Sequence, residues 1–200
     1  MNKYEKRSIE AYNKKAKNYE DTFDGKFTSK FKTMLIETAK INTGDNIIDI
    51  ACGNGRLLNM FKSRYEIKGF GTDISNEMVN QAKLMNPSMN FSVASCEEIP
   101  FPDNSFDIIT VCAAYHHFPD VAKFAREACR VLKQGGTIYI AEVYCHPVIR
   151  IFCNPFLPLL KEGDVKFYSP YEIINTLSSA GFISQTHIKR NHIQIVSACK

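Results

Sequence analysis

Hydrophobic residues along the chain form two kinds of segment, which alternate. Short continuous apolar runs bounded by turn-forming residues predict buried strands of a parallel sheet. Between them, apolar residues recur at helical spacing, as Phe31, Met34 and Leu35 do within residues 29–41. The strands are predicted at residues 46–51, 67–73, 90–94, 106–113 and 137–142. Strands alternating with helices of about ten residues predict an α/β sandwich with a mostly parallel sheet.

Capping residues mark the ends of several predicted helices. Ser75 and Asp120 are predicted N-caps. Ser169-Pro170-Tyr171-Glu172 combines an N-cap, a proline in the first turn and a capping-box glutamate. Gly135-Gly136 is predicted to end the helix that begins after Asp120.

The C-terminal tail predicts two strands joined by a tight turn, at residues 182–189 and 192–199. This hairpin adds an antiparallel strand, so we expect an α/β fold with a mostly parallel seven-stranded sheet and one antiparallel C-terminal strand. We expect residues 1–40 to form a helical cap and residues 41–200 to form the main domain. Residues 145–168 are an apolar insertion within that domain, interrupted by prolines.

The composition supports a cytoplasmic globular protein. Of 200 residues, 44% are hydrophobic and 23% charged, which excludes wholesale disorder. No apolar run approaches the ~20 residues needed to cross a bilayer, so we expect no stable membrane insertion. The N-terminus lacks the apolar stretch of a secretory signal. The 7 cysteines include no CxxC pair, which favours reduced thiols over disulfides or a zinc ribbon.

The net charge of +4 arises within residues 1–40, where ten Lys/Arg outnumber six Asp/Glu. The rest of the chain is neutral. A mixed-sign segment of this kind is typical of a solvated helical face, whereas a nucleic-acid interface needs a denser basic patch. We therefore predict no nucleic-acid partner.

The first predicted strand ends in a small-residue turn, Ala51-Cys52-Gly53-Asn54-Gly55. Small residues let the backbone approach a ligand closely. The dinucleotide fingerprint G-x-G-x-x-G, aligned on Gly53, would need glycine where the chain has Ala51 and Arg56. No Gly-Lys-Ser/Thr follows, so a P-loop is also excluded. The turn favours a ligand without a pyrophosphate.

The next two strand ends carry groups suited to a nucleoside. Asp73 follows the second strand, where a carboxylate can accept hydrogen bonds from both hydroxyls of a ribose. Ile74 and Met78 offer an apolar face to an adenine ring, and Ser95 with the Cys96 backbone could bind its polar edge. Each feature alone has a structural alternative, such as a helix cap at Asp73, but their order along the strand ends favours a binding site.

The chain resembles the class I S-adenosylmethionine-dependent methyltransferases of the small-molecule type, which include the ubiquinone/menaquinone-biosynthesis enzymes. The resemblance spans residues 30–199, and EEIPFPDNSFD (97–107) is its most specific part. It implies a Rossmann-like three-layer sandwich and S-adenosyl-L-methionine as the cofactor. The family usually has glycine where Ala51 stands and often aspartate where Ser95 stands.

The resemblance also implies a role for each matching position. The methionine end of the cofactor would contact the first strand end, at Asp49, Ala51, Cys52, Gly53 and Gly55. Asp73 would bind the ribose. The adenine would lie among Ile74, Met78, Ser95, Cys96 and Glu97. Ala113 would line the wall near the sulfonium, and Tyr19 would cover the cofactor or simply pack as amphipathic cover.

Methyl transfer from a sulfonium is an in-line displacement, in which alignment is the main requirement. The sequence shows no catalytic triad, and we assign no catalytic residue. His116 or His117 could act as a base, orient a substrate, or hydrogen-bond to the backbone in the pocket wall. The expected partner is a small, partly hydrophobic methyl acceptor. The alternative is a non-catalytic cofactor-binding or scaffold protein of the same fold.

The insertion at residues 145–168 has three possible roles: a lid over the reacting centre, a dimer contact, or a contact with a membrane surface. The oligomeric state, monomer or homodimer, stays open with it. The spacing of Cys145, His146 and Cys153 fits no common zinc site, and we predict no metal.

Overall fold

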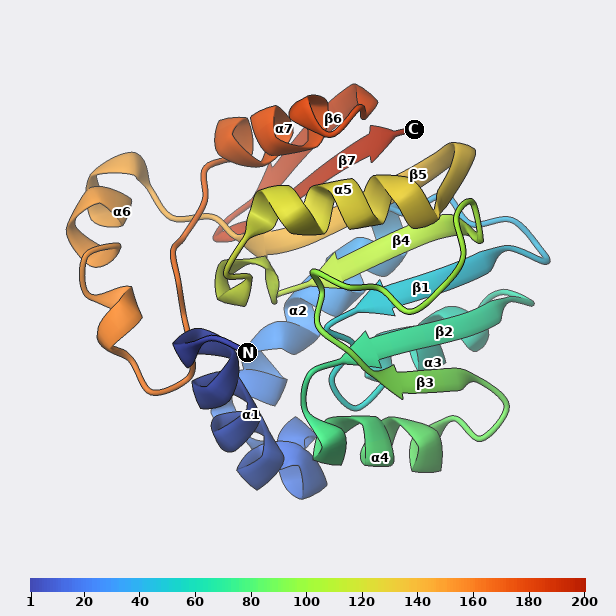
Figure 1. The fold of residues 1–200 in the computed structure, drawn as a ribbon, viewed down its shortest axis with the longest axis horizontal. Helices are drawn as coiled ribbons and strands as arrows, with labels where there is room; N and C mark the ends of the chain where they lie inside the picture. Colours follow the sequence, from blue (N-terminus) through green and yellow to red (C-terminus); the bar gives the residue numbers. More distant parts are fainter.

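One sheet of seven strands runs through the protein, in the order β3-β2-β1-β4-β5-β7-β6. The computed structural model describes residues 1–200 (Figure 1). The strands are β1 Asn46–Ile50, β2 Lys68–Asp73, β3 Asn90–Val93, β4 Phe106–Cys112, β5 Leu132–Val143, β6 Ile183–Arg190 and β7 Ile193–Cys199. Neighbours from β3 to β5 are parallel, and β7 runs antiparallel to both β5 and β6. This confirms the predicted fold class.

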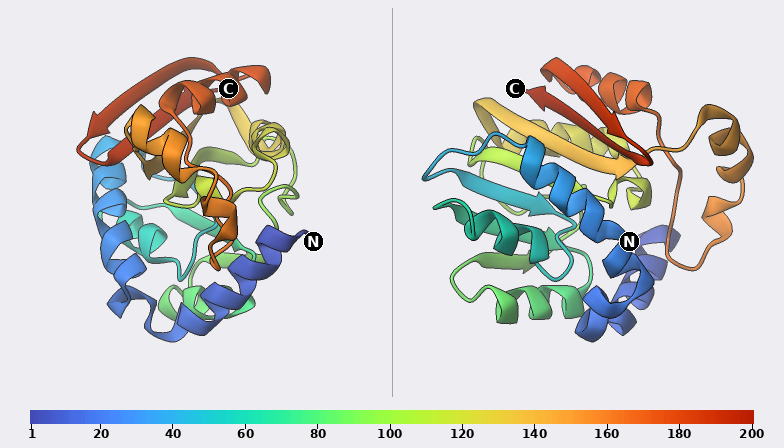
Figure 2. Two further views of the ribbon diagram at one scale, coloured as in Figure 1. Left: turned by 90° about the vertical axis from the view of Figure 1, so that its left-hand side faces the viewer. Right: turned by 180° about the vertical axis from the view of Figure 1, so that it is seen from behind.

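Helices cover both faces of the sheet (Figure 2). The α-helices are α1 Lys3–Lys15, α2 Phe23–Thr38, α3 Arg56–Lys62, α4 Asn76–Met85, α5 Val121–Val131, α6 Pro147–Cys153 and α7 Pro170–Ser179, and the 3₁₀ helices are η1 Ala16–Asp21, η2 Tyr115–His117 and η3 Leu157–Leu159. Helices α2, α3 and α4 pack on one face, and α5 and α7 on the other. Each face of the sheet thus has its own hydrophobic core. Successive residues of a strand face opposite ways, so Ile47 packs in the core under α2, α3 and α4, and Ile48 packs in the core under α5 and α7.

Two predicted helix boundaries are wrong. Helix α5 ends at Val131, because Leu132 is extended and pairs with Phe106 of β4. Gly135 and Gly136 therefore lie within β5, where a Cβ at Gly136 would come 2.9 Å from the Asp107 carbonyl oxygen. Helix α2 begins at Phe23 instead of near residue 29, because the Thr22 side chain caps it by accepting from the Gly25 N–H.

The N-terminal segment and the insertion both lie at the carboxyl ends of the parallel strands. Figure 1 shows α1 near the ends of β1 and β2, with α6 further out on the same side of the molecule. The chain after α6 contacts α1, because Arg7 donates to the Pro158 carbonyl oxygen and Ser8 to that of Glu162. Ligands of open α/β sheets bind at this edge. No helix of the protein has the length and apolar character that a membrane crossing requires.

Candidate functional site

The ends of β1 and β2 are joined through the Asp73 carboxylate. Its Oδ2 accepts a hydrogen bond from the Gly53 N–H at 2.8 Å, and its Oδ1 accepts from the Ser75 N–H at 2.8 Å. Burial raises the pKa of Asp73, while these backbone donors and that of Ile74 oppose the rise. The sequence predicted this proximity, because carboxyl ends of adjacent parallel strands share one edge of the sheet.

A pocket opens at this edge, enclosing about 760 Å³ including its mouth. Of its 18 lining residues, 11 are hydrophobic. The predicted site residues in its wall are Tyr19, Ala51, Gly53, Asp73, Ile74, Met78, Ser95, Cys96 and Ala113.

Four other predicted site residues lie outside the pocket wall. Asp49 is buried beneath it and accepts a hydrogen bond from the Thr110 hydroxyl at 2.7 Å. Cys52 packs in the core cluster of α2, α3 and α4. Gly55 begins α3, where a Cβ would meet the side chains of α4 and β3. Glu97 accepts from the Asp120 N–H and faces Lys123 at 3.8 Å.

Two alanines in the pocket wall have left-handed backbone conformations. Ala51 has φ 56° and Ala113 has φ 52°. Such conformations cost free energy in residues with a Cβ and concentrate at functional sites. Ala51 therefore has a backbone conformation that favours glycine, the residue that the resemblance led us to expect at this position.

Helix α1 supplies a wall of the pocket that the sequence analysis did not identify. Glu5, Ser8 and Tyr12 all line it. The Ser95 hydroxyl donates to Glu5 Oε1 at 3.1 Å. Asn13 Oδ1 accepts from the Ser75 hydroxyl at 2.6 Å, which attaches α1 to the start of α4. Glu5 belongs to a capping box with Asn2, but that signal predicts a helix start and not a pocket.

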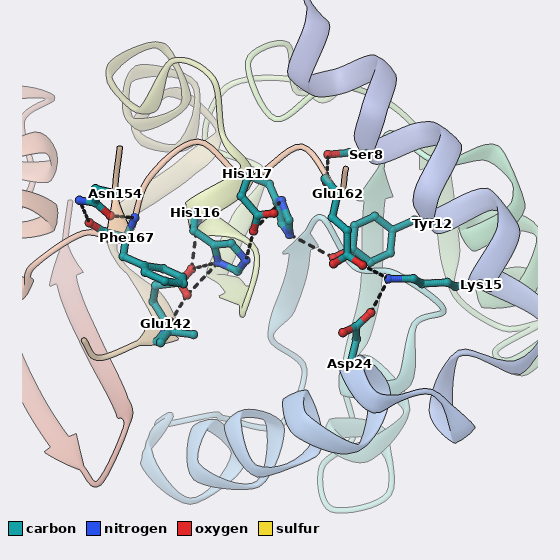
Figure 3. Close-up of polar contacts among 12 residues, drawn as sticks. Ser8, Tyr12, Lys15, Asp24, His116, His117, Glu142, Asn154, Glu162 and Phe167 are labelled. Carbon is teal, nitrogen blue, oxygen red and sulfur yellow. Dashed lines mark hydrogen bonds and ion pairs between the residues drawn. The ribbon is translucent and has the colours of Figure 1, made fainter. Parts of the chain in front are cut away.

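The two histidines after β4 have different surroundings (Figure 3). His117 lines the pocket, and its Nε2 lies 3.0 Å from the Tyr12 hydroxyl. Burial lowers the pKa of His117, with further lowering by the charge of His116 and a small opposing effect of the Gly163 backbone. His116 Nδ1 lies 2.9 Å from both oxygens of Glu142. Although burial alone would lower it, the pKa of His116 is raised by the carboxylates of Glu142 and Asp164.

The family described as "Methyltransferase domain" matches residues 48–140 of the chain. An uncharacterized methyltransferase of Bacillus subtilis, YcgJ, is 38% identical over 128 residues, which are 60% of this chain and 50% of that protein. Its crystal structure superposes with a TM-score of 0.72 at 31% identity, covering 80% of this chain and 71% of that one.

The ubiquinone/menaquinone biosynthesis C-methyltransferase UbiE of Neisseria meningitidis is 32% identical over 169 residues, which are 80% of this chain and 64% of that protein. The chain thus spans between half and two thirds of the length of these two curated relatives. Together with the sheet order and the pocket at its edge, these matches establish that the chain belongs to the class I S-adenosylmethionine-dependent methyltransferase family, whose cofactor is S-adenosyl-L-methionine.

Proposed function

We propose that the chain transfers a methyl group from S-adenosyl-L-methionine to a small, partly hydrophobic organic acceptor by in-line displacement. The observation that carries this proposal is the Asp73 carboxylate, held by the Gly53 N–H at 2.8 Å in the wall of a largely apolar pocket. A carboxylate at this position can accept hydrogen bonds from the hydroxyls of a ribose, and the small residues of the adjacent turn let the ligand approach the backbone.

The residues of the pocket fit the cofactor. The backbone donors of Gly53, Ile74 and Ser75 do not use all the lone pairs of the Asp73 carboxylate, which can still accept from a sugar hydroxyl. A Cβ placed on Gly53 would meet no atom within 4 Å, which leaves open space above this turn. Ile74 and Met78 provide an apolar surface for the base. When bound, the cofactor supplies an activated methyl group with a neutral leaving group.

The protein's own contribution is to position the reactants and exclude water. Helix α1 and Tyr19 contribute to the pocket wall, and Ala113 and Phe118 add apolar surface to it. Tyr12 and His117 provide a polar pair in the wall, suited to orient a hydroxyl or amine of the acceptor. Positioning of this kind can contribute about 7–11 kcal/mol to a two-substrate reaction.

The apolar insertion supports a partly hydrophobic acceptor. We propose that residues 1–40 act as a cap and that residues 145–168 act as a lid beside it. Lys15 of α1 forms ion pairs with Asp24 of α2 and with Glu162 of the insertion, which joins the three segments. A closed cover of this kind excludes water from the reacting centre.

Titration calorimetry with S-adenosylhomocysteine tests the cofactor half of the proposal. We expect Asp73→Asn to weaken binding by at least tenfold, because a charge-assisted hydrogen bond is lost. Asp103→Asn is the matched control, because Asp103 is exposed and pairs with Arg130 away from the pocket. Equal affinity of Asp73→Asn and wild-type protein would contradict the assignment.

Turnover tests the catalytic half. We expect release of S-adenosylhomocysteine with acceptors that carry a hydroxyl, amine or activated carbon on an apolar ring. Tight cofactor binding without turnover across such a panel would instead support the alternative, a non-catalytic cofactor-binding protein of the same fold.

A further inference from the structure

Three side chains of metal-ligating types meet at the pocket wall: His117, which lines the pocket, and His116 and Asp164 beside it. His116 Nε2 lies 3.6 Å from Asp164 Oδ1, and His117 Nδ1 lies 3.9 Å from the same oxygen. All three ligand atoms lie within 4.8 Å of one another. We propose that His116, His117 and Asp164 form a binding site for a divalent transition-metal ion, with Zn²⁺ as the ion whose preferences fit best.

The separations are close to those of a formed site. Ligand atoms of a tetrahedral zinc site lie roughly 3.4 Å apart, given a zinc–nitrogen distance of about 2.0–2.1 Å. The separations of 3.6 Å and 3.9 Å from Asp164 Oδ1 are close to this value, and the ligand nitrogens of the two histidines lie within 4.8 Å of one another, so binding requires side-chain rotations but no rearrangement of the backbone elements. Two imidazoles with one carboxylate suit zinc and its transition-metal neighbours, whereas Mg²⁺ and Ca²⁺ prefer oxygen ligands.

Glu142 already orients His116 as a ligand. Its carboxylate lies 2.9 Å from Nδ1 and also accepts from the backbone N–H groups of His116 and Val143 (Figure 3). A proton on Nδ1 leaves the lone pair of Nε2 directed at Asp164. Metal-bound histidines commonly donate their second ring N–H to a carboxylate in this way.

Two atoms at this site are buried and make no well-aligned hydrogen bond: Nδ1 of His117, although the Gly163 backbone acts on this ring, and Oδ2 of Asp164. The other ring nitrogen of His117 is engaged by Tyr12, which leaves Nδ1 as the available ligand atom. Buried polar atoms normally have partners, and a metal ion would supply one to each side chain. This unmet coordination is the observation, independent of the spacing, that points to a ligand.

Charge balance favours a dication. The Glu142 side chain is fully buried and Asp164 is largely buried, and both carboxylates lie against the imidazole of His116. Buried charges are normally paired or bound to metals. Glu162, a further acidic group of the insertion, is paired with Lys15. A divalent ion would neutralise the two carboxylates together.

The site would attach the insertion to the catalytic domain. Asp164 belongs to the insertion, whereas both histidines belong to η2, directly after β4. The His116 carbonyl oxygen already accepts from the N–H groups of Val165, at 2.8 Å, and Lys166, at 3.3 Å. A bound ion would add a second attachment at the same place. Metal binding requires neither cofactor nor acceptor and can be tested without them, so its failure would be distinguishable from a failure of the proposed function.

Calorimetric titration of chelator-treated protein with ZnCl₂ tests the site. We expect one ion per chain, with affinity reduced at least tenfold in His116→Ala and in Asp164→Asn. His187→Ala is the control, because His187 lies on edge strand β6, away from the cluster. Absence of saturable binding in wild-type protein, or binding unchanged by Asp164→Asn, would overturn the proposal.

Cobalt substitution tests the ligands in the wild-type protein, so the result does not depend on how a variant folds. We expect d–d absorption typical of nitrogen and oxygen ligands, without sulfur-to-cobalt charge transfer. We also expect Zn²⁺ to slow hydrogen exchange at the Val165 and Lys166 amides. Sulfur charge transfer that disappears in Cys145→Ser would instead assign the ion to the cysteines of the insertion and contradict the proposal.

Discussion

At the residue scale, Asp49 shows how burial can set the pH dependence of stability. Its side chain lies beneath the pocket and is 2% exposed. Burial raises its pKa to about 7, although the Thr110 hydroxyl and the charge of Lys32 lower it. Between about pH 4 and pH 7, Asp49 ionises readily only in the unfolded state. The free energy of unfolding therefore decreases as the pH rises through this range, and below about pH 4 this effect is absent.

Asp49→Asn should remove this effect while keeping an acceptor for Thr110. We expect the variant to gain stability relative to wild type as the pH increases from 4 to 8, by roughly 2–4 kcal/mol at the upper end. Urea unfolding of the ligand-free protein at a series of pH values measures this difference. A difference that stays constant with pH would show that the Asp49 carboxyl ionises normally in the folded protein.

Glu5 provides a second prediction at this scale, which rests on the proposed function. It is the carboxylate of α1 that lies against Ser95, at the end of the pocket assigned to the base. We expect Glu5→Gln to weaken S-adenosylhomocysteine binding about tenfold or more, since hydrogen bonds to charged groups contribute about 1.5–3 kcal/mol. Glu10→Gln, exposed on the same helix, is the control. Equal losses in both variants would indicate an effect on the helix alone.

At the element scale, the junction of η1 and α2 determines where Tyr19 lies. Gly25 sits in the first turn of α2 directly against η1, and a Cβ there would come 2.1 Å from the Tyr19 carbonyl oxygen. Backbone atoms of η1 therefore have to move if any side chain is added. Since Tyr19 lines the pocket, the packing of two helices is coupled to the site.

Gly25→Ala should consequently impair both stability and cofactor binding. Overpacking of this kind costs about 1–3 kcal/mol, and displacement of η1 moves Tyr19 out of the pocket wall. Thermal unfolding and S-adenosylhomocysteine titration measure the two effects. Lys26→Ala, one residue further along α2 and exposed, should change neither. A Gly25→Ala protein of normal stability and affinity would show that η1 tolerates the shift.

At the scale of the whole molecule, local pattern predicted the sheet well and the pocket only in part. The apolar runs and turn residues placed both ends of six strands to within one residue, because these strands carry their signal in their own residues. The fifth strand was predicted too short. Its first residue, Leu132, pairs with Phe106 of β4, and Gly135 and Gly136 exchange backbone hydrogen bonds with Lys200, so this part of β5 depends on distant partners and not on local preference. Asp73 and Ser95 could be predicted as site candidates because they directly follow strands that the local pattern places.

The walls contributed by distant segments could not be predicted in this way. Glu5 and Ser8 reach the pocket only because α1 folds back across the sheet edge, and Asp164 meets His116 and His117 only through the path of the insertion. Amphipathic spacing shows which face of a helix is apolar but does not show what that face meets. Residues that reach a site through long-range packing therefore cannot be recognised from the pattern of their neighbours in the sequence.

The position of α1 has a consequence for the speed of the reaction. The helix is hydrogen-bonded to Ser75 through Asn13 and to Ser95 through Glu5. We expect these contacts to separate before a bound nucleoside leaves past the helix. We therefore expect the residence time of the spent cofactor, rather than the displacement itself, to limit how often each molecule turns over.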